Sequence, residues 1–168
     1  MNNVFLLFLA KIKLIDSLQM NFSVSKKLFI QKLEENIDDD KKFQIFEQFS
    51  SSYNDYKGVV NEEGFRLRRR KHFADYNLGL TSIFGRIEDK GEKIKIDIRL
   101  FINPTFVLLL LGLFGFFITV MIFNDSNILI FIISYSILLF IIVYIILRND
   151  ISKAKKDFEK DLFFYINK

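Results

Sequence analysis

The sequence predicts an α+β protein: a small helix and an antiparallel sheet, followed by a two-helix transmembrane hairpin and an amphipathic tail helix. Three observations lead to this prediction. Residues 94–102 place an isoleucine or leucine at every second position, as in a strand with one buried face. Residues 105–123 and 128–147 are apolar runs without a charged residue. Residues 148–168 repeat apolar side chains at helical spacing.

These patterns divide the chain of 168 residues into four parts. Residues 1–20 precede the first amphipathic segment. Residues 21–103 form the expected cytoplasmic α+β domain. Residues 104–147 form the expected membrane hairpin, and residues 148–168 form a cytoplasmic amphipathic tail.

The first part begins with an apolar stretch at residues 4–10. No positive residue precedes this stretch, and Lys11 and Lys13 follow it, which is unlike a secretory signal peptide. Two interpretations stay open. Residues 1–20 are either an interfacial or packing segment, or an upstream extension of a domain that opens at Met20.

The domain itself is expected to open with a short helix after Ser25. Ser25 is suited to be the N-cap, and Phe29 and Leu33 lie four residues apart on one face. The acidic run at residues 38–40 lacks the ligand spacing of a calcium loop, which favours a solvated connection over a metal site.

Two strand pairs follow in a sheet that we expect to have four or five antiparallel strands. Residues 56–60 and 65–70 flank a loop at 61–64, in which Gly64 is expected to adopt a positive φ. Residues 82–88 and 93–102 flank a turn at 89–91.

The apolar runs fit a bilayer in length, because about 20 helical residues cross its hydrocarbon core. Lysine and arginine flank the pair on both sides, and the turn at 124–127 has neither. The positive-inside rule therefore predicts a multi-pass protein of the bacterial cytoplasmic (inner) membrane with both termini cytoplasmic. With no ionisable residue in either run, the hairpin is expected to be an anchor or docking surface rather than a transport path.

Small and hydroxyl side chains suggest how the two membrane helices pack. Gly112, Gly115 and Thr119 share one helix face, and we expect this notch to receive the second helix near Ser134 and Ser136. The alternative is that these glycines have no specific packing role.

The densest basic cluster is Arg66, Arg68 and Arg70, which share one face of a strand, followed by Lys71. This row could bind phosphate, most naturally that of lipid headgroups. The alternative is a solvated face that pairs with acidic neighbours across the sheet. Nucleic acid is not expected, because the net charge of +4 is modest and no aromatic residues alternate with the arginines.

Nothing in the sequence predicts an enzyme. The chain has no cysteine and one histidine, His72, and it has no glycine-rich phosphate loop. No catalytic residue, metal or cofactor is therefore expected.

The tail places Ile151, Ala154, Phe158, Leu162 and Tyr165 on one helical face. This face could lie on the bilayer, bind a partner helix or fold back on the domain, and folding back is our first expectation.

A resemblance supports this architecture. The run 64–69, Tyr76-Asn77, residues 84–87 and the strand 91–102 that enters an apolar helix resemble a family of small uncharacterised bacterial membrane proteins with a soluble β-rich domain and a membrane hairpin. Here Ile98-Arg99-Leu100 occupies the last element without the methionine of that pattern. The resemblance implies an architecture and no activity.

Two functions follow as expectations. The first is a non-enzymatic accessory or docking subunit of a cytoplasmic-membrane complex, a class that includes immunity proteins, with the bilayer and a membrane protein as partners. The second is a sensor of anionic lipid or a phospholigand that binds through Arg66, Arg68 and Arg70, which we call the arginine strand. Self-association of the chain stays open.

Overall fold

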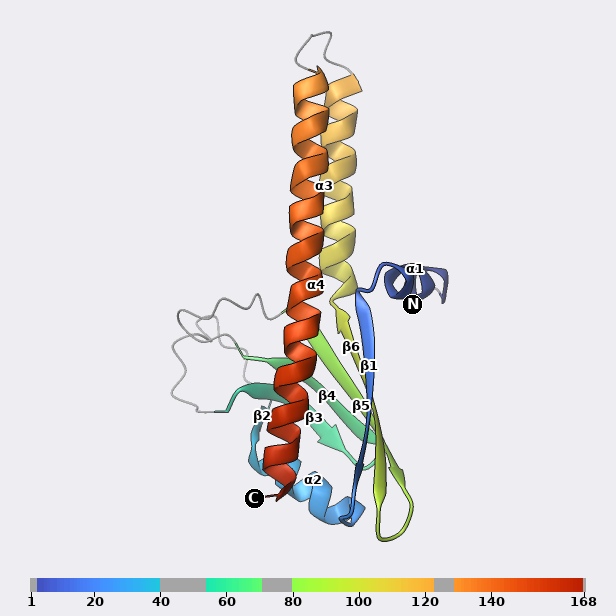
Figure 1. Ribbon diagram of the computed structural model, residues 1–168, viewed down its shortest axis with the longest axis vertical. Helices are drawn as coiled ribbons and strands as arrows, with labels where there is room; N and C mark the ends of the chain where they lie inside the picture. Colours follow the sequence, from blue (N-terminus) through green and yellow to red (C-terminus); the bar gives the residue numbers. More distant parts are fainter. Residues whose placement is uncertain (1–2, 40–53, 71–79, 123–128, 168) are drawn as a thin grey trace.

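The fold is a single six-stranded sheet with helices on one face, from which two long helices project (Figure 1). This computed structural model describes residues 3–39, 54–70, 80–122 and 129–167. The helices are α1 (Asn3–Lys11), α2 (Lys26–Glu35), α3 (Pro104–Ile122) and α4 (Leu129–Asn167). The strands are β1 (Ile15–Phe22), β2 (Ile37–Asp39), β3 (Tyr56–Asn61), β4 (Gly64–Arg69), β5 (Thr81–Asp89) and β6 (Ile94–Ile102).

The sheet has the strand order β1-β6-β5-β4-β3-β2. All neighbours are antiparallel except β2 and β3, which are parallel. The α+β class is confirmed, but the expected count of four or five antiparallel strands is wrong. Both additional strands lie at the edges of the sheet, where β1 pairs with β6 and β2 pairs with β3.

The hairpin of β5 and β6 forms the centre of the sheet, as its alternating pattern predicts. Ile94, Ile96, Ile98, Leu100 and Ile102 are all buried on one face. Gly91 has a φ of 82° in the connecting turn, a conformation in which glycine avoids the clash of a Cβ atom. Burial of these five side chains fixes the register of β6, because a shift by one residue would expose all of them.

The prediction for Gly64 is wrong, since Gly91 is the glycine for which a positive φ is found among the described residues. Gly64 instead begins β4 as an extended residue that pairs with Arg86. A Cβ atom at Gly64 would lie 2.0 Å from the backbone oxygen of Gly85. The position therefore needs glycine for close approach of two strands rather than for a turn.

Strand β1 crosses the domain boundary that the sequence suggested at residue 21. Leu18, Met20 and Phe22 pair with Ile98, Ile96 and Ile94 of β6. The sheet thus begins at Ile15, and Met20 lies within a strand rather than at the start of a domain. Helix α1 precedes this strand and buries Leu9 in the core, so the end of α1 and strand β1 pack with the domain.

Helix α2 begins and packs as expected. The Ser25 hydroxyl accepts a hydrogen bond from the Leu28 backbone N–H at 3.4 Å, as an N-cap does. Phe29 and Leu33 are fully buried and face the sheet side on which α4 also lies. The acidic residues Asp38 and Asp39 belong to strand β2 rather than to a loop.

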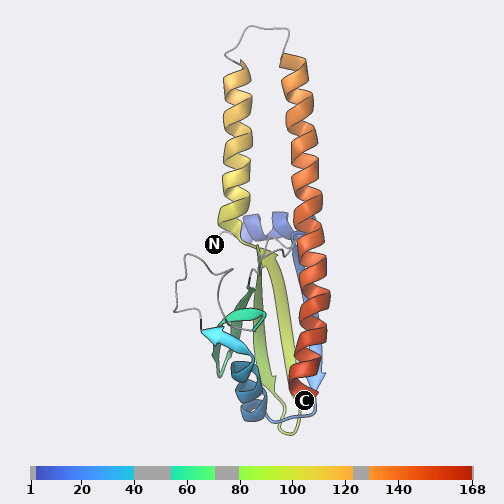
Figure 2. The same ribbon diagram turned by 90° about the vertical axis from the view of Figure 1, so that its left-hand side faces the viewer.

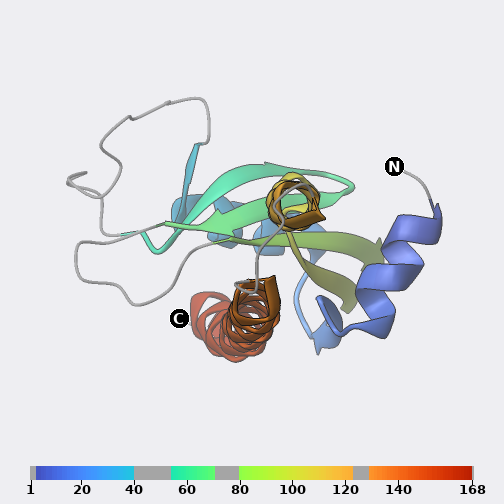
Figure 3. The same cartoon turned by 90° about the horizontal axis from the view of Figure 1, so that it is seen from above.

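The tail is the second half of one continuous helix. Helix α4 is 39 residues long and passes without a break from its apolar half into residues 148–167. No glycine or proline interrupts the sequence between 129 and 167. Seen from above, α4 lies against one face of the sheet (Figure 3). The expected packing of the tail on the domain is confirmed. The tail is not a separate helix, because α4 continues into it from the second apolar run.

The expected tail face provides the contact with the sheet. The side chains that α4 buries recur every three or four residues: Ile151, Ala154, Phe158, Leu162 and Ile166. Tyr165, the last member of the predicted face, is partly buried beside them.

Helix α3 leaves the sheet directly after β6. Asn103 caps it by accepting a hydrogen bond from the Thr105 backbone N–H at 3.0 Å, and Pro104 occupies the first helical position. Helices α3 and α4 run antiparallel beyond the sheet (Figure 2), and α1 lies to one side of their base (Figure 1). The connection at 123–128 lies outside the described residues.

Candidate functional site

An apolar cleft separates α3 and α4 above helix α1. Its volume is about 220 Å³. Helix α3 contributes Val107, Leu110, Leu111, Leu113 and Phe114 to its lining, α4 contributes Tyr135, Ser136, Leu139, Phe140, Val143, Tyr144 and Leu147, and the α1 region contributes Phe8, Ile12 and Leu14. Most of the lining carries no polar side-chain atom, so an apolar ligand fits it best.

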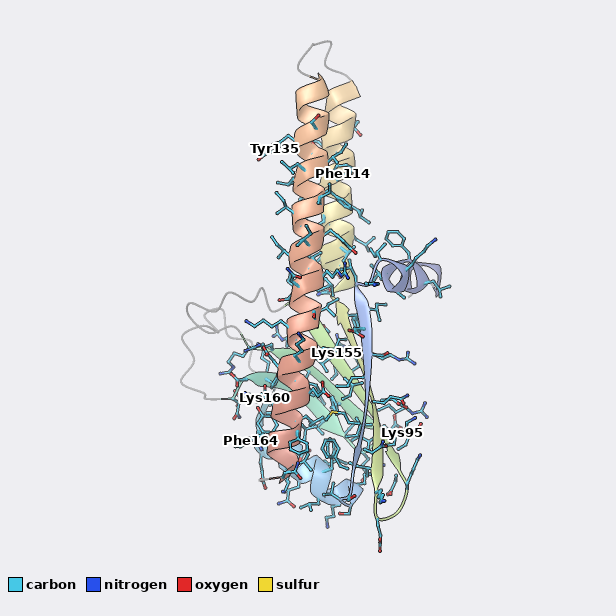
Figure 4. All side chains as sticks on the ribbon, in the orientation of Figure 1. Lys95, Phe114, Tyr135, Lys155, Lys160 and Phe164 are labelled. Atoms are coloured by element: carbon cyan, nitrogen blue, oxygen red, sulfur yellow. The ribbon has the colours of Figure 1, made fainter. Side chains whose placement is uncertain are left out.

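Two contacts join the elements that surround the cleft. The rings of Phe114 and Phe140 meet across it, with centroids 5.5 Å apart. At its base the hydroxyl of Tyr144 donates a hydrogen bond to the backbone oxygen of Ile12 at 3.1 Å. Figure 4 shows Phe114 and Tyr135 on the upper parts of the two helices. The ring contact joins α3 to α4, and the hydrogen bond joins α4 to the turn that follows α1.

The glycine notch does not take part in this packing. Gly112 and Gly115 are exposed, and a Cβ atom at either would meet nothing within 4 Å outside its own helix. The Thr119 hydroxyl donates to the backbone oxygen of Gly115 in its own helix at 2.9 Å. Ser134 is exposed, and Ser136 lines the cleft. The packing expected from these residues is wrong in this structure, because larger side chains hold the helices apart.

The arginines of the predicted row lie in two different environments. Arg66 and Arg68 are exposed on the sheet face opposite α4. Arg70 lies just beyond the end of β4, is buried, and forms an ion pair with Asp38. Lys71 lies outside the described residues. The expectation of three arginines in one accessible row is wrong, because Arg70 is held by an acidic partner that the sequence pattern did not reveal.

Aromatic side chains accompany the remaining arginines on this outer face. The guanidinium of Arg66 lies 5.1 Å from the centre of the Phe84 ring, and the Phe84 and Phe101 rings stack at 4.9 Å. Arg99 pairs with Phe84 across the next strand and is exposed. This part of the face combines arginines with aromatic rings, a composition that can bind phosphate or carboxylate groups, and Asp97 and Glu88 lie on the same face opposite Arg86 and Lys95.

A polar cluster joins α4 to the other face of the sheet. The hydroxyl of Tyr56 donates to the carboxylate of Asp161 at 2.9 Å, and Arg69 forms an ion pair with Asp157. Nearer the apolar half, the Thr81 hydroxyl donates to Asp150 at 2.8 Å in a buried setting. These bonds satisfy polar groups where the helix covers the sheet, so they attach α4 to the domain.

Burial raises the pKa values of three side chains in and beside this cluster. It raises the pKa of Asp161 above the ordinary value of 3.8, while the hydrogen bond from Tyr56 opposes the shift. Burial and the nearby Asp161 carboxylate raise the pKa of Tyr56 well above 10 and that of Tyr165 to about 12. Both phenols therefore stay protonated at neutral pH, and the hydroxyl of Tyr56 donates to Asp161.

Metal and nucleophile chemistry find no support in the described part of the chain. No group of three or more histidine or acidic residues is arranged there to hold a metal ion. Cysteine is missing from the whole sequence. His72, the single histidine, lies outside the described residues.

Comparison with known proteins adds no relative, since no family model, no curated protein and no solved structure matches this chain. The resemblance to small bacterial membrane proteins therefore stays a prediction. Within the described residues one helix, Ser134–Asn167, is long and apolar enough to cross a membrane, and Thr105–Phe116 is a shorter apolar helix.

Proposed function

We propose that this chain is a non-enzymatic integral membrane protein that serves as an accessory or docking subunit of a bacterial cytoplasmic-membrane complex, a class that includes membrane-embedded immunity proteins. Helices α3 and α4 would cross the bilayer as a hairpin, with both termini and the sheet on the cytoplasmic side. The lipid bilayer and a membrane protein are the partners, and no cofactor takes part.

The observation that carries this proposal is the change of environment along α4. Its lower half buries one stripe of side chains against the sheet. In its upper half Leu138, Ile142 and Ile145 are about half exposed although the helix has no polar face there. Apolar side chains exposed over this length favour contact with lipid or with another membrane helix.

The continuity of α4 has a mechanical consequence. A partner that tilts or displaces the membrane half would move the sheet as well, because no flexible linker separates them. Helix α3 also enters the sheet directly through β6. Two rigid connections suit a subunit that fixes the position of a cytoplasmic domain relative to a membrane complex.

Membrane insertion is tested by fractionation and by cysteine labelling. The protein should stay in the membrane pellet after an alkaline carbonate wash. Because the chain has no cysteine, single substitutions report topology without background. Ser126→Cys should react with an impermeant maleimide in intact cells, and Lys160→Cys should react only after the membrane is opened. Release by carbonate, or labelling of Lys160→Cys in intact cells, would contradict the proposal.

The docking role is tested by co-purification in a mild detergent. Leu138→Gln together with Ile142→Gln should remove the partner while the protein stays folded, because these side chains form the outer surface of α4. A matched pair on the sheet, Ser17→Gln with Gln19→Ala, should leave the partner bound. Retention of the same partner by both pairs would contradict docking through the helices.

The second candidate is a sensor of anionic lipid or a phospholigand, which the arrangement of Arg66 over Phe84 favours. Replacement of Arg66 and Arg68 with Gln should then abolish binding to vesicles that contain phosphatidylglycerol while complex assembly is retained. Arg70 is left unchanged in this test, because its loss would leave Asp38 without its cation. Unchanged vesicle binding would exclude this candidate.

A further inference from the structure

We propose that the cleft between α3 and α4 binds an acyl chain of one anionic phospholipid, whose phosphate contacts Lys11, Lys13 and Arg148 at the base of the cleft. This inference rests on the membrane insertion proposed above. It assigns the cleft a ligand class and assigns a role to three basic residues that the accessory function does not use.

The interior of the cleft has the character of an acyl-chain site. Ser136, Tyr135 and Tyr144 supply its polar side-chain atoms, and the hydroxyl of Tyr144 is already bonded to the backbone oxygen of Ile12. A polar ligand would therefore lose its hydration and could gain only Ser136 and Tyr135 as side-chain partners. A hydrocarbon chain makes no hydrogen bonds with water, so it gives up none when it enters between the apolar walls.

Helix α1 brings two cations to the base of the cleft. Ile12 lines the cleft, and its neighbours Lys11 and Lys13 are exposed. Lys13 has a φ of 56°, in the left-handed region where a glycine would be less strained. The hydrogen bonds from Lys13 N to Ala10 O at 3.0 Å and from Leu14 N to Leu9 O at 2.8 Å hold this turn. The turn thus places the exposed Lys13 directly after the lining residue Ile12.

Helix α4 brings the third cation to the same place. Arg148 follows the lining residue Leu147 and is exposed. It lies four residues after Tyr144, hence on the same helix face and one turn nearer the sheet. Because Tyr144 is bonded to Ile12, this face of α4 is directed toward the turn that contains Lys13.

Two carboxylates close in sequence to these cations have other partners. Asp16 forms an ion pair with Lys155 at 2.9 Å, and Asp150 is turned toward the hydroxyl of Thr81 on the sheet. The side chains of Lys11, Lys13 and Arg148 make no hydrogen bond or ion pair within the described part of the chain. A phosphate at the boundary between the apolar helices and the sheet would complement them by charge-assisted hydrogen bonds. In the proposed orientation this is the cytoplasmic leaflet, where anionic lipid attracts basic residues.

A single tryptophan tests the site, because the chain contains none. Tyr135→Trp places the probe in the lining, and Leu138→Trp places it on α4 outside the lining. Each variant is purified in detergent and titrated with phosphatidylglycerol or phosphatidylcholine that carries brominated acyl chains, which quench tryptophan on contact. Phosphatidylglycerol should quench Tyr135→Trp at a severalfold lower mole fraction than phosphatidylcholine does, and the two lipids should quench Leu138→Trp alike.

Charge variants then locate the headgroup contact. In the Tyr135→Trp background, replacing Lys11, Lys13 and Arg148 with Gln should remove the preference for phosphatidylglycerol. Replacing Lys27, Lys90 and Lys93 with Gln, an equal change in charge on exposed positions of α2 and the β5–β6 turn, should leave it intact. Circular dichroism confirms that each variant is folded before titration.

Three outcomes would overturn the inference. The first is equal quenching of Tyr135→Trp by the two lipids. The second is a preference that survives loss of the three basal cations. The third is quenching that falls as protein concentration rises, which would indicate that a second copy of the chain occupies the cleft. Each can occur in a protein that resists the carbonate wash, so failure here is distinct from failure of the proposed membrane insertion.

Discussion

The two halves of α4 differ in how their apolar side chains are distributed around the helix. In the lower half Ile151, Phe158 and Leu162 are no more than 2% exposed, while Lys153 and Glu159 on the other side are exposed. In the upper half Leu138, Leu139 and Phe140 are between 45% and 54% exposed although they point in different directions. The lower half has one apolar stripe, and the upper half is apolar all round.

We infer the surroundings of each half from this difference rather than from helix length. A stripe of period 3.6 indicates a helix with water on one side and protein on the other. An apolar surface without a stripe indicates that no side of the helix meets bulk water. The boundary falls at Leu147, which is buried at the base of the cleft, and Arg148, which is exposed.

The largest effect is expected from Phe158→Ala in the lower half. Phe158 is fully buried and its ring contacts Tyr56 at 5.3 Å and Phe65 at 5.8 Å between centroids. The cavity should lower the free energy of unfolding by about 3–5 kcal/mol. Denaturant unfolding of the protein in mild detergent measures this loss. The control Phe163→Ala, at a side chain that is 61% exposed, should change it by less than about 0.5 kcal/mol. Equal losses would contradict the packing of α4 on the sheet.

A charge in the upper half should have the next largest effect. Ile142→Asp places a carboxylate in the apolar half and should raise the apparent free energy of membrane insertion by about 2.5–3.5 kcal/mol. A microsomal insertion assay on the segment 128–167 measures the change. In the same segment Lys153→Asp, beyond the proposed membrane helix, should leave insertion unaltered. If Asp changed the apparent free energy of insertion equally at both positions, the proposed difference between the two halves would be contradicted.

A smaller effect, with a dependence on pH, is expected at Asp161 in the lower half. Burial raises the pKa of this carboxyl, so the folded state holds the proton at a higher pH than the unfolded state does. The stabilisation from Asp161 is therefore present at low pH and is lost as pH rises through the folded pKa. Relative to Asp161→Asn, the native protein should become more stable as pH falls from neutrality toward about 4.

Unfolding free energies of the native protein and Asp161→Asn across this range test the prediction. Asn keeps an oxygen that can accept the hydroxyl of Tyr56, so the variant should still fold. Glu159→Gln removes the same charge from an exposed position and serves as the control. A difference between native protein and Asp161→Asn that does not vary with pH would contradict a raised pKa at Asp161.

The smallest effect is expected at Lys155, which forms an ion pair with Asp16 of β1 at 2.9 Å. Their side chains are 29% and 41% exposed, so solvent screens the pair. Lys155→Gln should lower the free energy of unfolding by less than about 1 kcal/mol. A loss as large as that of Phe158→Ala would show that the charge, rather than the apolar stripe, fixes α4 to the sheet.

Periodicity predicts the central elements well. The alternation in 94–102 and the stripe from Ile151 to Leu162 each identify which side chains are buried, because both patterns repeat over several turns or residues. Strand β1 shows the limit of this approach. Leu18, Met20 and Phe22 also alternate, but Met20 and the apolar stretch before it left an upstream extension open as one of two interpretations. The pairing of β1 with β6 decides the question, and it joins residues about 80 apart in the chain.

The candidate sites were less predictable, because they depend on contacts between distant residues. The pairing of Arg70 with Asp38 removes one arginine from the expected row, and no local pattern indicates it. The cleft likewise depends on the Phe114 and Phe140 rings, which hold α3 and α4 apart where small residues suggested close packing. Composition predicted the character of these surfaces, and tertiary contacts decided their shape.

The most direct test of the account is a nitroxide scan along α4 in lipid bilayers, with single cysteines at successive positions from 136 to 164. Accessibility to oxygen and to a water-soluble nickel complex is measured at each position. We predict uniformly low nickel access and high oxygen access up to Leu147, then a 3.6-residue oscillation in nickel access with minima at Ile151, Phe158 and Leu162. A nickel oscillation that extends through residues 136–147 would contradict the account, because that half would then have one face in water.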